Sequence, residues 1–172
     1  MVLNLNKILL VFFAVVIFTA PVRVFALPDD SQQALHIASD SLLVDYKTGV
    51  HTYEGNVKID QGSTHLTADR LVTSSNKQHK LEEGIAYGLT KLAEYTTLPK
   101  AGDVLFQAKA KTIKFYPIKS MVYLEGDVVV TQGDNSFQGP IIIYNIKDQV
   151  VTAPASQVGR ATIVIEPKKL KS

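Results

Sequence analysis

The stretch that decides the fold is EGNVKIDQG, Glu54 to Gly62, because the chain repeats it as EGDVVVTQG, Glu125 to Gly133. The second copy lies 71 residues after the first (125 minus 54), with no gap inside it. In the first copy, apolar Val57 and Ile59 alternate with polar neighbours, which indicates a strand with one apolar face. One set of hairpins cannot bury such a face alone, but a second set of the same shape can cover it. The repeat therefore predicts a structural duplication.

The glycines of the repeated stretch have structural explanations. Gly55 and Gly126 lie in the strand pattern, where glycine permits a bend or a close approach of another chain segment. Gly62 and Gly133 follow a glutamine at the end of the strand, a position typical of a left-handed turn residue. The stretch is thus interpreted as structural rather than as a ligand-binding loop.

Similarity at the same spacing extends over residues 39–74 and 110–145, where residue type is kept more than identity. The matched apolar positions are Leu42 with Ile113, Val44 with Phe115, Tyr53 with Leu124, Ile59 with Val130, Leu66 with Phe137 and Leu71 with Ile142. Each unit is predicted to run strand, turn, strand, turn. A corner, where the chain changes direction, is expected near SDSL (residues 39–42) or ADRL (residues 68–71). The joining segment, 77–107, is expected to add strands of its own.

Most of the remaining pattern also favours strands. Val, Ile, Thr and Tyr are frequent after Ala34, and short Gly, Asn, Asp or Ser turns recur. The best helical candidate, 79–95, is interrupted by Gly84 and Gly88. We therefore predict an all-β chain of many short antiparallel strands.

The N-terminus reads as a secretory signal, residues 1–26. Lys7 precedes an apolar run from Ile8 to Ala20, and Val24 to Ala26 provides a cleavage site. The run has 13 residues, fewer than the roughly 20 needed for a membrane-spanning helix. The mature chain, 27–172, is expected to form one exported domain.

Composition and motifs argue against several functions. Lys7 and Arg23 leave with the signal, so the mature chain balances 16 basic with 16 acidic residues, which does not suggest nucleic acid as a partner. There is no cysteine and no G-x-S-x-G motif. The acidic pair Glu82-Glu83 is interpreted as solvated, and the histidines are too scattered for a metal site; they are His36, His51, His65 and His79. We predict no catalysis, no metal and no cofactor.

An ordered set of motifs resembles a known family. It comprises LHIASD near the mature start, GNVKIDQG, the ADR corner, MVYLEGDVVVTQG and the late alternating strand ending in ATIVIEP. Together they are similar to the OstA-like family of periplasmic lipopolysaccharide-transport proteins, over most of 34–167. The resemblance implies an open β-jellyroll (β-taco), in which two facing sheets enclose an apolar groove for the lipid A part of lipopolysaccharide. It also implies end-to-end self-association, with an inner-membrane-anchored LptC-like partner and an outer-membrane LptD-like partner.

Two sequence features agree with this function. Unsealed sheets leave strand edges that can accept a neighbour's strand, and head-to-tail pairing of two different edges gives an open filament. The predicted partner edges are Ala34, His36 and Ala38 at the start and Thr162, Ile163, Val164 and Ile165 at the end.

The second feature is an alternating set of apolar positions that could line the groove. Alternation alone does not distinguish a lipid-lined wall from an ordinary dry core. The predicted wall consists of Leu35, Ile37, Leu42, Val44, Tyr53, Val57, Ile59, Leu66, Leu71, Tyr95, Phe106, Ile113, Phe115, Leu124, Val128, Val130, Phe137, Ile142 and Tyr144.

Three alternatives stay open on the residues alone. The chain could be a closed lipid carrier that works as a monomer, or a purely structural periplasmic β protein that binds no lipid. It could also be an outer-membrane protein that crosses with strands, although three mature Phe and no Trp leave little for aromatic girdles.

Overall fold

The computed structural model describes residues 30–78, 80–98 and 103–165. The predicted signal segment, 1–26, lies outside these residues. Twelve strands and two short 3-10 helices make up the described chain, so the all-β prediction is confirmed. The elements are η1 (Asp30–Gln32), β1 (His36–Ala38), β2 (Ser41–Asp45), β3 (Val50–Gln61), β4 (Thr64–Ser75), β5 (Leu81–Tyr87), β6 (Ala93–Thr97), β7 (Phe106–Ala110), β8 (Thr112–Tyr116), η2 (Pro117–Lys119), β9 (Met121–Gln132), β10 (Asn135–Asn145), β11 (Val150–Thr152) and β12 (Thr162–Ile165).

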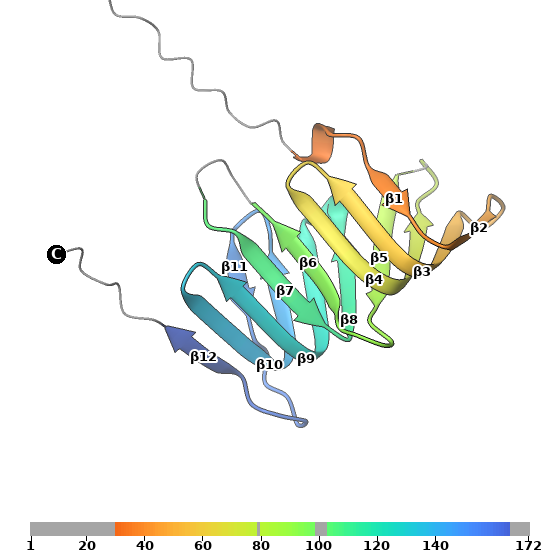
Figure 1. The fold of residues 1–172 in the computed structure, drawn as a ribbon. Helices are drawn as coiled ribbons and strands as arrows, with labels where there is room; N and C mark the ends of the chain where they lie inside the picture. Colours follow the sequence, from red (N-terminus) through yellow and green to blue (C-terminus); the bar gives the residue numbers. More distant parts are fainter. Residues whose placement is uncertain (1–29, 79, 99–102, 166–172) are drawn as a thin grey trace, which may run out of the picture.

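The strand pairings divide the sheet into two facing antiparallel layers. The long strands β3, β4, β9 and β10 run through both layers, and each short strand pairs with only one half of a long strand. Layer A has the order β2-β3-β4-β5-β8-β9-β10-β11. Layer B has the order β1-β3-β4-β6-β7-β9-β10-β12. Figure 1 shows the resulting elongated double layer, and the predicted β-jellyroll architecture is confirmed.

The long strands pass from one layer to the other at the repeated glycines. Gly55 has a φ of 76° and Asn56 a φ of 48°, and the β3–β4 register shifts at this point. Gly126 and Asp127 repeat this with φ values of 77° and 52°. Two successive residues in the left-handed region redirect a strand sharply, and glycine adopts this region without a Cβ penalty. The predicted bend at the repeated stretch is confirmed.

The second glycine of each repeat makes the turn at the far end of the hairpin. Gly62 has a φ of 59° between β3 and β4, and Gly133 a φ of 60° between β9 and β10. Both lie in the left-handed region, so the predicted turn role is confirmed.

Equivalent strands of the two copies begin 71 residues apart, which is the spacing of the sequence repeat. β3 begins at Val50 and β9 at Met121, while β2 begins at Ser41 and β8 at Thr112. The pairing repeats as well. We call β1 to β6 unit 1 and β7 to β12 unit 2. The strands expected in the joining segment are β5 and β6.

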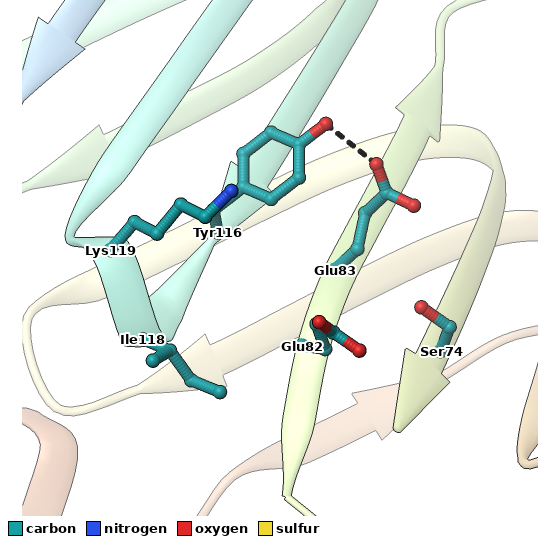
Figure 2. A pocket seen from close by; sticks show the side chains of 6 residues that line it. All are labelled: Ser74, Glu82, Glu83, Tyr116, Ile118 and Lys119. Atoms are coloured by element: carbon teal, nitrogen blue, oxygen red, sulfur yellow. Dashed lines mark hydrogen bonds between the residues drawn. The ribbon is translucent and has the colours of Figure 1, made fainter. Parts of the chain in front are cut away.

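The two units meet where β5 pairs with β8 in layer A and β6 with β7 in layer B. On the outer face of layer A, the Tyr116 hydroxyl donates a 2.6 Å hydrogen bond to Glu83 Oε1 across this junction (Figure 2). This hydrogen bond raises the pKa of Tyr116 to about 12. Glu82 is exposed as expected, but Glu83 is half-buried and bonded rather than freely solvated. Residue spacing could not show this bond, because Glu83 and Tyr116 meet only through the β5–β8 pairing.

Candidate functional site

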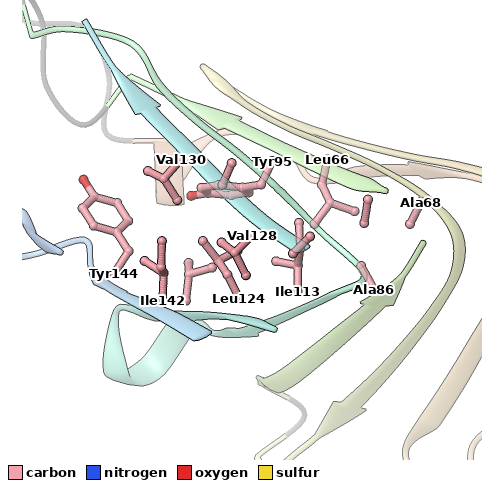
Figure 3. Packing of buried hydrophobic residues seen from close by; sticks show 14 of the residues in the cluster. Leu66, Ala68, Ala86, Tyr95, Ile113, Leu124, Val128, Val130, Ile142 and Tyr144 are labelled. Atoms are coloured by element: carbon pink, nitrogen blue, oxygen red, sulfur yellow. The ribbon is translucent and has the colours of Figure 1, made fainter. Parts of the chain in front are cut away.

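The space between the layers holds most of the predicted wall. Its centre is continuous through both units and is filled by buried apolar side chains (Figure 3). These buried wall residues are Val57, Leu66, Leu71, Tyr95, Phe106, Ile113, Leu124, Val128, Val130, Ile142 and Tyr144. A second group is half-buried and packs against this centre: Ile37, Tyr53, Ile59, Phe115 and Phe137.

Three predicted wall residues lie at the N-terminal end instead. Val44 is half-buried, whereas Leu35 is 44% exposed and Leu42 is 55% exposed. Both leucines belong to the apolar pattern, but at this end β1 and β2 have no further strand of the described chain beside them. Their exposure follows from their place at the rim.

Buried residues differ in their distance from the bends. Ala68 lies at the corner of β4, next to the β3–β4 register shift, whereas Tyr144 lies near the end of β10, away from the β9–β10 register shift at Gly139. We call the side opposite the bends the mouth.

Contacts between the two layers cross the mouth. The rings of Phe106 in β7 and Tyr144 in β10 are stacked with centroids 4.0 Å apart. Beside them, Gln149 Nε2 donates a 2.7 Å hydrogen bond to Asp103 Oδ2. Burial raises the pKa of Tyr144, and the nearby Asp103 carboxylate raises it further. Among the described residues, the contacts that close the mouth are therefore between side chains and not backbone pairs.

A polar network borders the interior near the β3–β4 turn. Asp30 Oδ2 accepts hydrogen bonds from the Ser63 hydroxyl at 2.7 Å and from Thr64 Oγ1 at 2.9 Å, and Thr64 lies 2.8 Å from the Thr97 hydroxyl. Burial raises the pKa of Asp30, but the hydrogen bonds from Ser63 and Thr64 outweigh it and leave the pKa below its ordinary value. Burial also raises the pKa of Tyr95 to about 12. Asp30 thus holds η1 against the turn as a charged group.

The two ends of the double layer are strand edges. At the N-terminal rim, formed by β1 and β2, each strand pairs only with β3 among the described strands. At the C-terminal rim, formed by β11 and β12, each strand pairs with β10 and with no other described strand. The predicted edge residues His36 and Ala38 lie in β1, and Thr162 to Ile165 form β12; Ala34 precedes β1. All of these residues are exposed.

The C-terminal rim carries an apolar depression of about 200 Å³. It opens between β10, β11 and β12, and its lining includes buried Ile142 and half-buried Phe137. The full lining is Phe137, Gln138, Ile142, Val151, Ala153, Ala161, Thr162 and Ile163. Sequence reasoning missed this depression, because its lining residues come together only through strand pairing.

Within 30–78, 80–98 and 103–165, no helix is long and apolar enough to cross a bilayer. In the same residues, no three His, Cys, Asp or Glu side chains are grouped so that they could hold a metal ion.

Comparisons with known proteins agree with this geometry. Residues 36–150 match the family model described as LptA/(LptD N-terminal domain) LPS transport protein. The chain is 34% identical to the lipopolysaccharide export system protein LptH of Pseudomonas aeruginosa over 151 residues, which covers 84% of this chain and 85% of LptH. It is 29% identical to the lipopolysaccharide export system protein LptA of Escherichia coli K12, with 98% of this chain and 88% of LptA covered.

The fold is also similar to a solved structure. The crystal structure of LptH is described as that of the LptA homologous periplasmic component of the conserved lipopolysaccharide transport device from Pseudomonas aeruginosa. It superposes with a TM-score of 0.74 at 30% identity, covering 81% of this chain and 100% of that one. The likeness therefore extends over the whole of that structure.

Proposed function

Because the chain belongs to the LptA/(LptD N-terminal domain) LPS transport protein family, we propose that it carries lipopolysaccharide through the periplasm from the inner to the outer membrane. The lipid A part is held between the two layers, and copies stacked end to end make the path continuous. The chain acts by binding and not by catalysis.

The observation that carries this proposal is the apolar interior, which extends through both units and reaches both rims. At the N-terminal end it reaches exposed Leu42, and at the C-terminal end it reaches Ile163. Burying acyl chains contributes about 0.8 kcal/mol per CH₂, so a chain of roughly fourteen carbons offers on the order of 10 kcal/mol before ordering costs. Apolar contacts have no preferred direction, so a bound chain can slide along such a wall.

Lipid entry requires the layers to separate, because side chains fill the interior. The bends join the layers through continuous backbone, whereas the mouth is held by the Phe106–Tyr144 stack and the Asp103–Gln149 hydrogen bond. Contacts between side chains cost less to break than a strand ladder or a covalent chain. The mouth is thus the side that opens, and acyl chains replace the contacts that the apolar side chains make with one another.

The rims support the stacking part of the proposal. Each rim offers strand edges that no other described strand pairs with, and a different edge at each end gives head-to-tail assembly into an open filament. An LptC-like protein anchored in the inner membrane and an LptD-like protein in the outer membrane would take the two ends of the stack. Directional movement comes from these partners.

The test is photo-crosslinking with a matched pair of positions in β3. Ile59 is half-buried and packs against the interior, while its neighbour Lys58 is exposed on the opposite face. A photo-reactive residue at Ile59 is expected to capture lipopolysaccharide in cells, and one at Lys58 is not. Equal capture at both positions would contradict binding between the layers.

A second measurement separates the alternatives. Protein purified without detergent is assayed for bound lipopolysaccharide and, by sedimentation, for assembly that increases with concentration. Bound lipid together with assembly is the expected result. Lipid without assembly would indicate a monomeric carrier, and no lipid at all would indicate a structural protein.

A further inference from the structure

We infer that the junction between two stacked copies reproduces the junction between unit 1 and unit 2, with Ile163 of one copy directly opposite Ile37 of the next. This inference rests on the proposed end-to-end stacking and specifies its register. It follows from the internal repeat, because the protein already contains one such junction in its own chain.

The internal junction has a defined register in each layer. In layer B, Tyr95 of β6 lies opposite Ala108 of β7. In layer A, Ala86 of β5 lies opposite Ile113 of β8. All of these side chains are buried, with at most 3% exposed. The two strand pairs thus continue the apolar interior from one unit into the next.

The receiving strands of unit 2 have clear counterparts at the N-terminal rim. Ile37 lies opposite Ile59 in β3 as Ala108 lies opposite Val130 in β9. The same spacing relates Leu42 to Ile113, since Leu42 lies opposite Tyr53 and Ile113 opposite Leu124. β1 and β2 therefore present the same two strand edges as β7 and β8.

The donating strands of unit 1 have counterparts at the C-terminal rim. Tyr95 lies opposite Leu66 in β4, and Ile163 lies opposite Phe137 at the equivalent place in β10. In layer A, Ile85 lies opposite Val72 as Thr152 lies opposite Ile143. Ile163 is therefore the counterpart of Tyr95, and Ala153, the residue after Thr152, is the counterpart of Ala86.

Applying the internal register to two copies pairs the exposed isoleucines of β12 with apolar residues at the N-terminal rim of the next copy. Ile163, 53% exposed, faces Ile37 of the next copy, and Ile165, 68% exposed, faces Leu35. At every inward-facing position of this strand pair an apolar residue meets another apolar residue, except where Ala161 meets Ser39. A register shifted by one residue would turn the apolar side chains to the outer face.

In this arrangement, a side chain of the next copy occupies the depression at the C-terminal rim. Leu42 of the next copy lies opposite Ala153, which lines the depression. Its counterpart Ile113 is fully buried at the internal junction. The exposed Leu42 side chain therefore fills an apolar space that the described residues of a single copy leave open.

Two side chains of opposite charge also meet at this junction. Ala161 is the counterpart of Ala93 and faces Ser39 of the next copy, so the neighbouring Arg160 and Asp40 lie beside each other. Both side chains are exposed in one copy. Asp40 accepts a hydrogen bond from Asn56 at 2.8 Å, and a carboxylate retains further acceptor sites. Lys111 occupies the place of Asp40 in unit 2, so a basic side chain also fits there.

Paired cysteines test the register directly, because the chain has no cysteine of its own. The full secreted chain carries Ile37→Cys together with Ile163→Cys, and the control carries Ile37→Cys together with Ile165→Cys. Opposed residues in antiparallel strands have Cα atoms about 4.5–5.5 Å apart, within disulfide range, whereas two residues along a strand add about 7 Å. The first variant is expected to give a ladder of disulfide-linked oligomers on mild oxidation, about tenfold more than the control.

The outcomes separate the register from the proposed function. Assembly by sedimentation with preferential linking of the shifted control would overturn the register while leaving stacking intact. No assembly by sedimentation and no linking in either variant would overturn stacking itself, and the register with it.

A charge exchange gives a second test that needs no cysteine. Arg160→Asp is expected to slow association several-fold at low salt, and adding Asp40→Arg in the same chain is expected to restore it. The effect should fade at high salt, since exposed charges are screened. An association rate that neither change alters would contradict the predicted neighbours.

Discussion

The ring of Phe106 lies parallel to the ring of Tyr144 within 11° and 4.0 Å away, although the two belong to different layers. Neither side chain has any exposed surface. This pair closes the mouth of the double layer on the side away from the bends. Its place makes it part of the core and, under the proposed function, the contact that a lipid would displace.

Replacing Phe106 with alanine is therefore expected to lower the free energy of unfolding by about 3–5 kcal/mol, because the change leaves a cavity in a packed core. The neighbouring Leu105, 44% exposed, provides the control, and Leu105→Ala should change stability by about 0.5 kcal/mol or less. Urea unfolding followed by circular dichroism measures both. Similar losses for the two variants would show that the stack does not hold the layers together.

Gly55→Ala tests the bend. Gly55 has a φ of 76°, and a Cβ there would also meet the Asp40 carboxylate. A left-handed conformation costs an L-residue roughly 1–2 kcal/mol, so a loss of stability of about that size is expected. Gly84→Ala is the control, because a Cβ there meets only ordinary contacts, the nearest at 3.8 Å to Leu71. If Gly84→Ala proved the more harmful change, the bend would not depend on glycine.

Acid is expected to weaken the β3–β4 turn through Asp30. Its pKa in the folded state lies below the ordinary 3.8 because of the hydrogen bonds from Ser63 and Thr64, which outweigh burial. A lowered pKa means that the charged form stabilises the fold above pH 3.8, and that this contribution is lost as the pH falls through the lower, folded-state value.

Asp30→Ala should remove this part of the pH dependence and cost about 1 kcal/mol at pH 7, since the carboxylate is only partly buried. The measurement is urea unfolding at several pH values, with Asp134→Ala in the equivalent turn of unit 2 as the control. If the Asp30→Ala variant kept the full acid sensitivity, that sensitivity would have to come from other groups.

Substitutions of two adjacent leucines in β2 should have different effects on self-association. Leu42 points toward the interior side of the N-terminal rim, whereas Leu43 is the counterpart of Lys114 and is 67% exposed. Burying one leucine contributes about 1.5–3 kcal/mol, so Leu42→Ser should weaken self-association by about tenfold or more. Leu43→Ser should leave it unchanged. Sedimentation over a range of concentrations measures the effect, and equal weakening by both changes would argue against Leu42 filling the depression.

Much of the fold could be predicted from local patterns. The Glu-Gly-Asx-Val stretch predicts a bend, and Gly55 and Gly126 adopt the left-handed conformation there. The apolar alternation predicts which faces turn inward. The corner expected near ADRL is also present: β4 changes phase there, and Leu66 and Leu71, both in the predicted wall, are buried. A corner of this kind breaks the period of two, and the pairing with β3 shows that the change lies between Ala68 and Arg70.

The candidate site divides in the same way. Apolar positions such as Val130 and Ile142 belong to the predicted wall and lie between the layers. The pairs Asp103–Gln149 and Tyr116–Glu83 could not be predicted, because no sequence spacing links residues that meet through strand order. The depression at the C-terminal rim was missed for the same reason.

The sequence by itself determined the strands, their apolar faces, the bends and the duplication, because these depend on backbone preferences and side-chain alternation over a few residues. Only the tertiary structure decided which strand lies beside which, where the mouth closes and which edges stay free. Those properties depend on pairing between segments far apart in the chain, and the same local pattern is compatible with more than one such pairing.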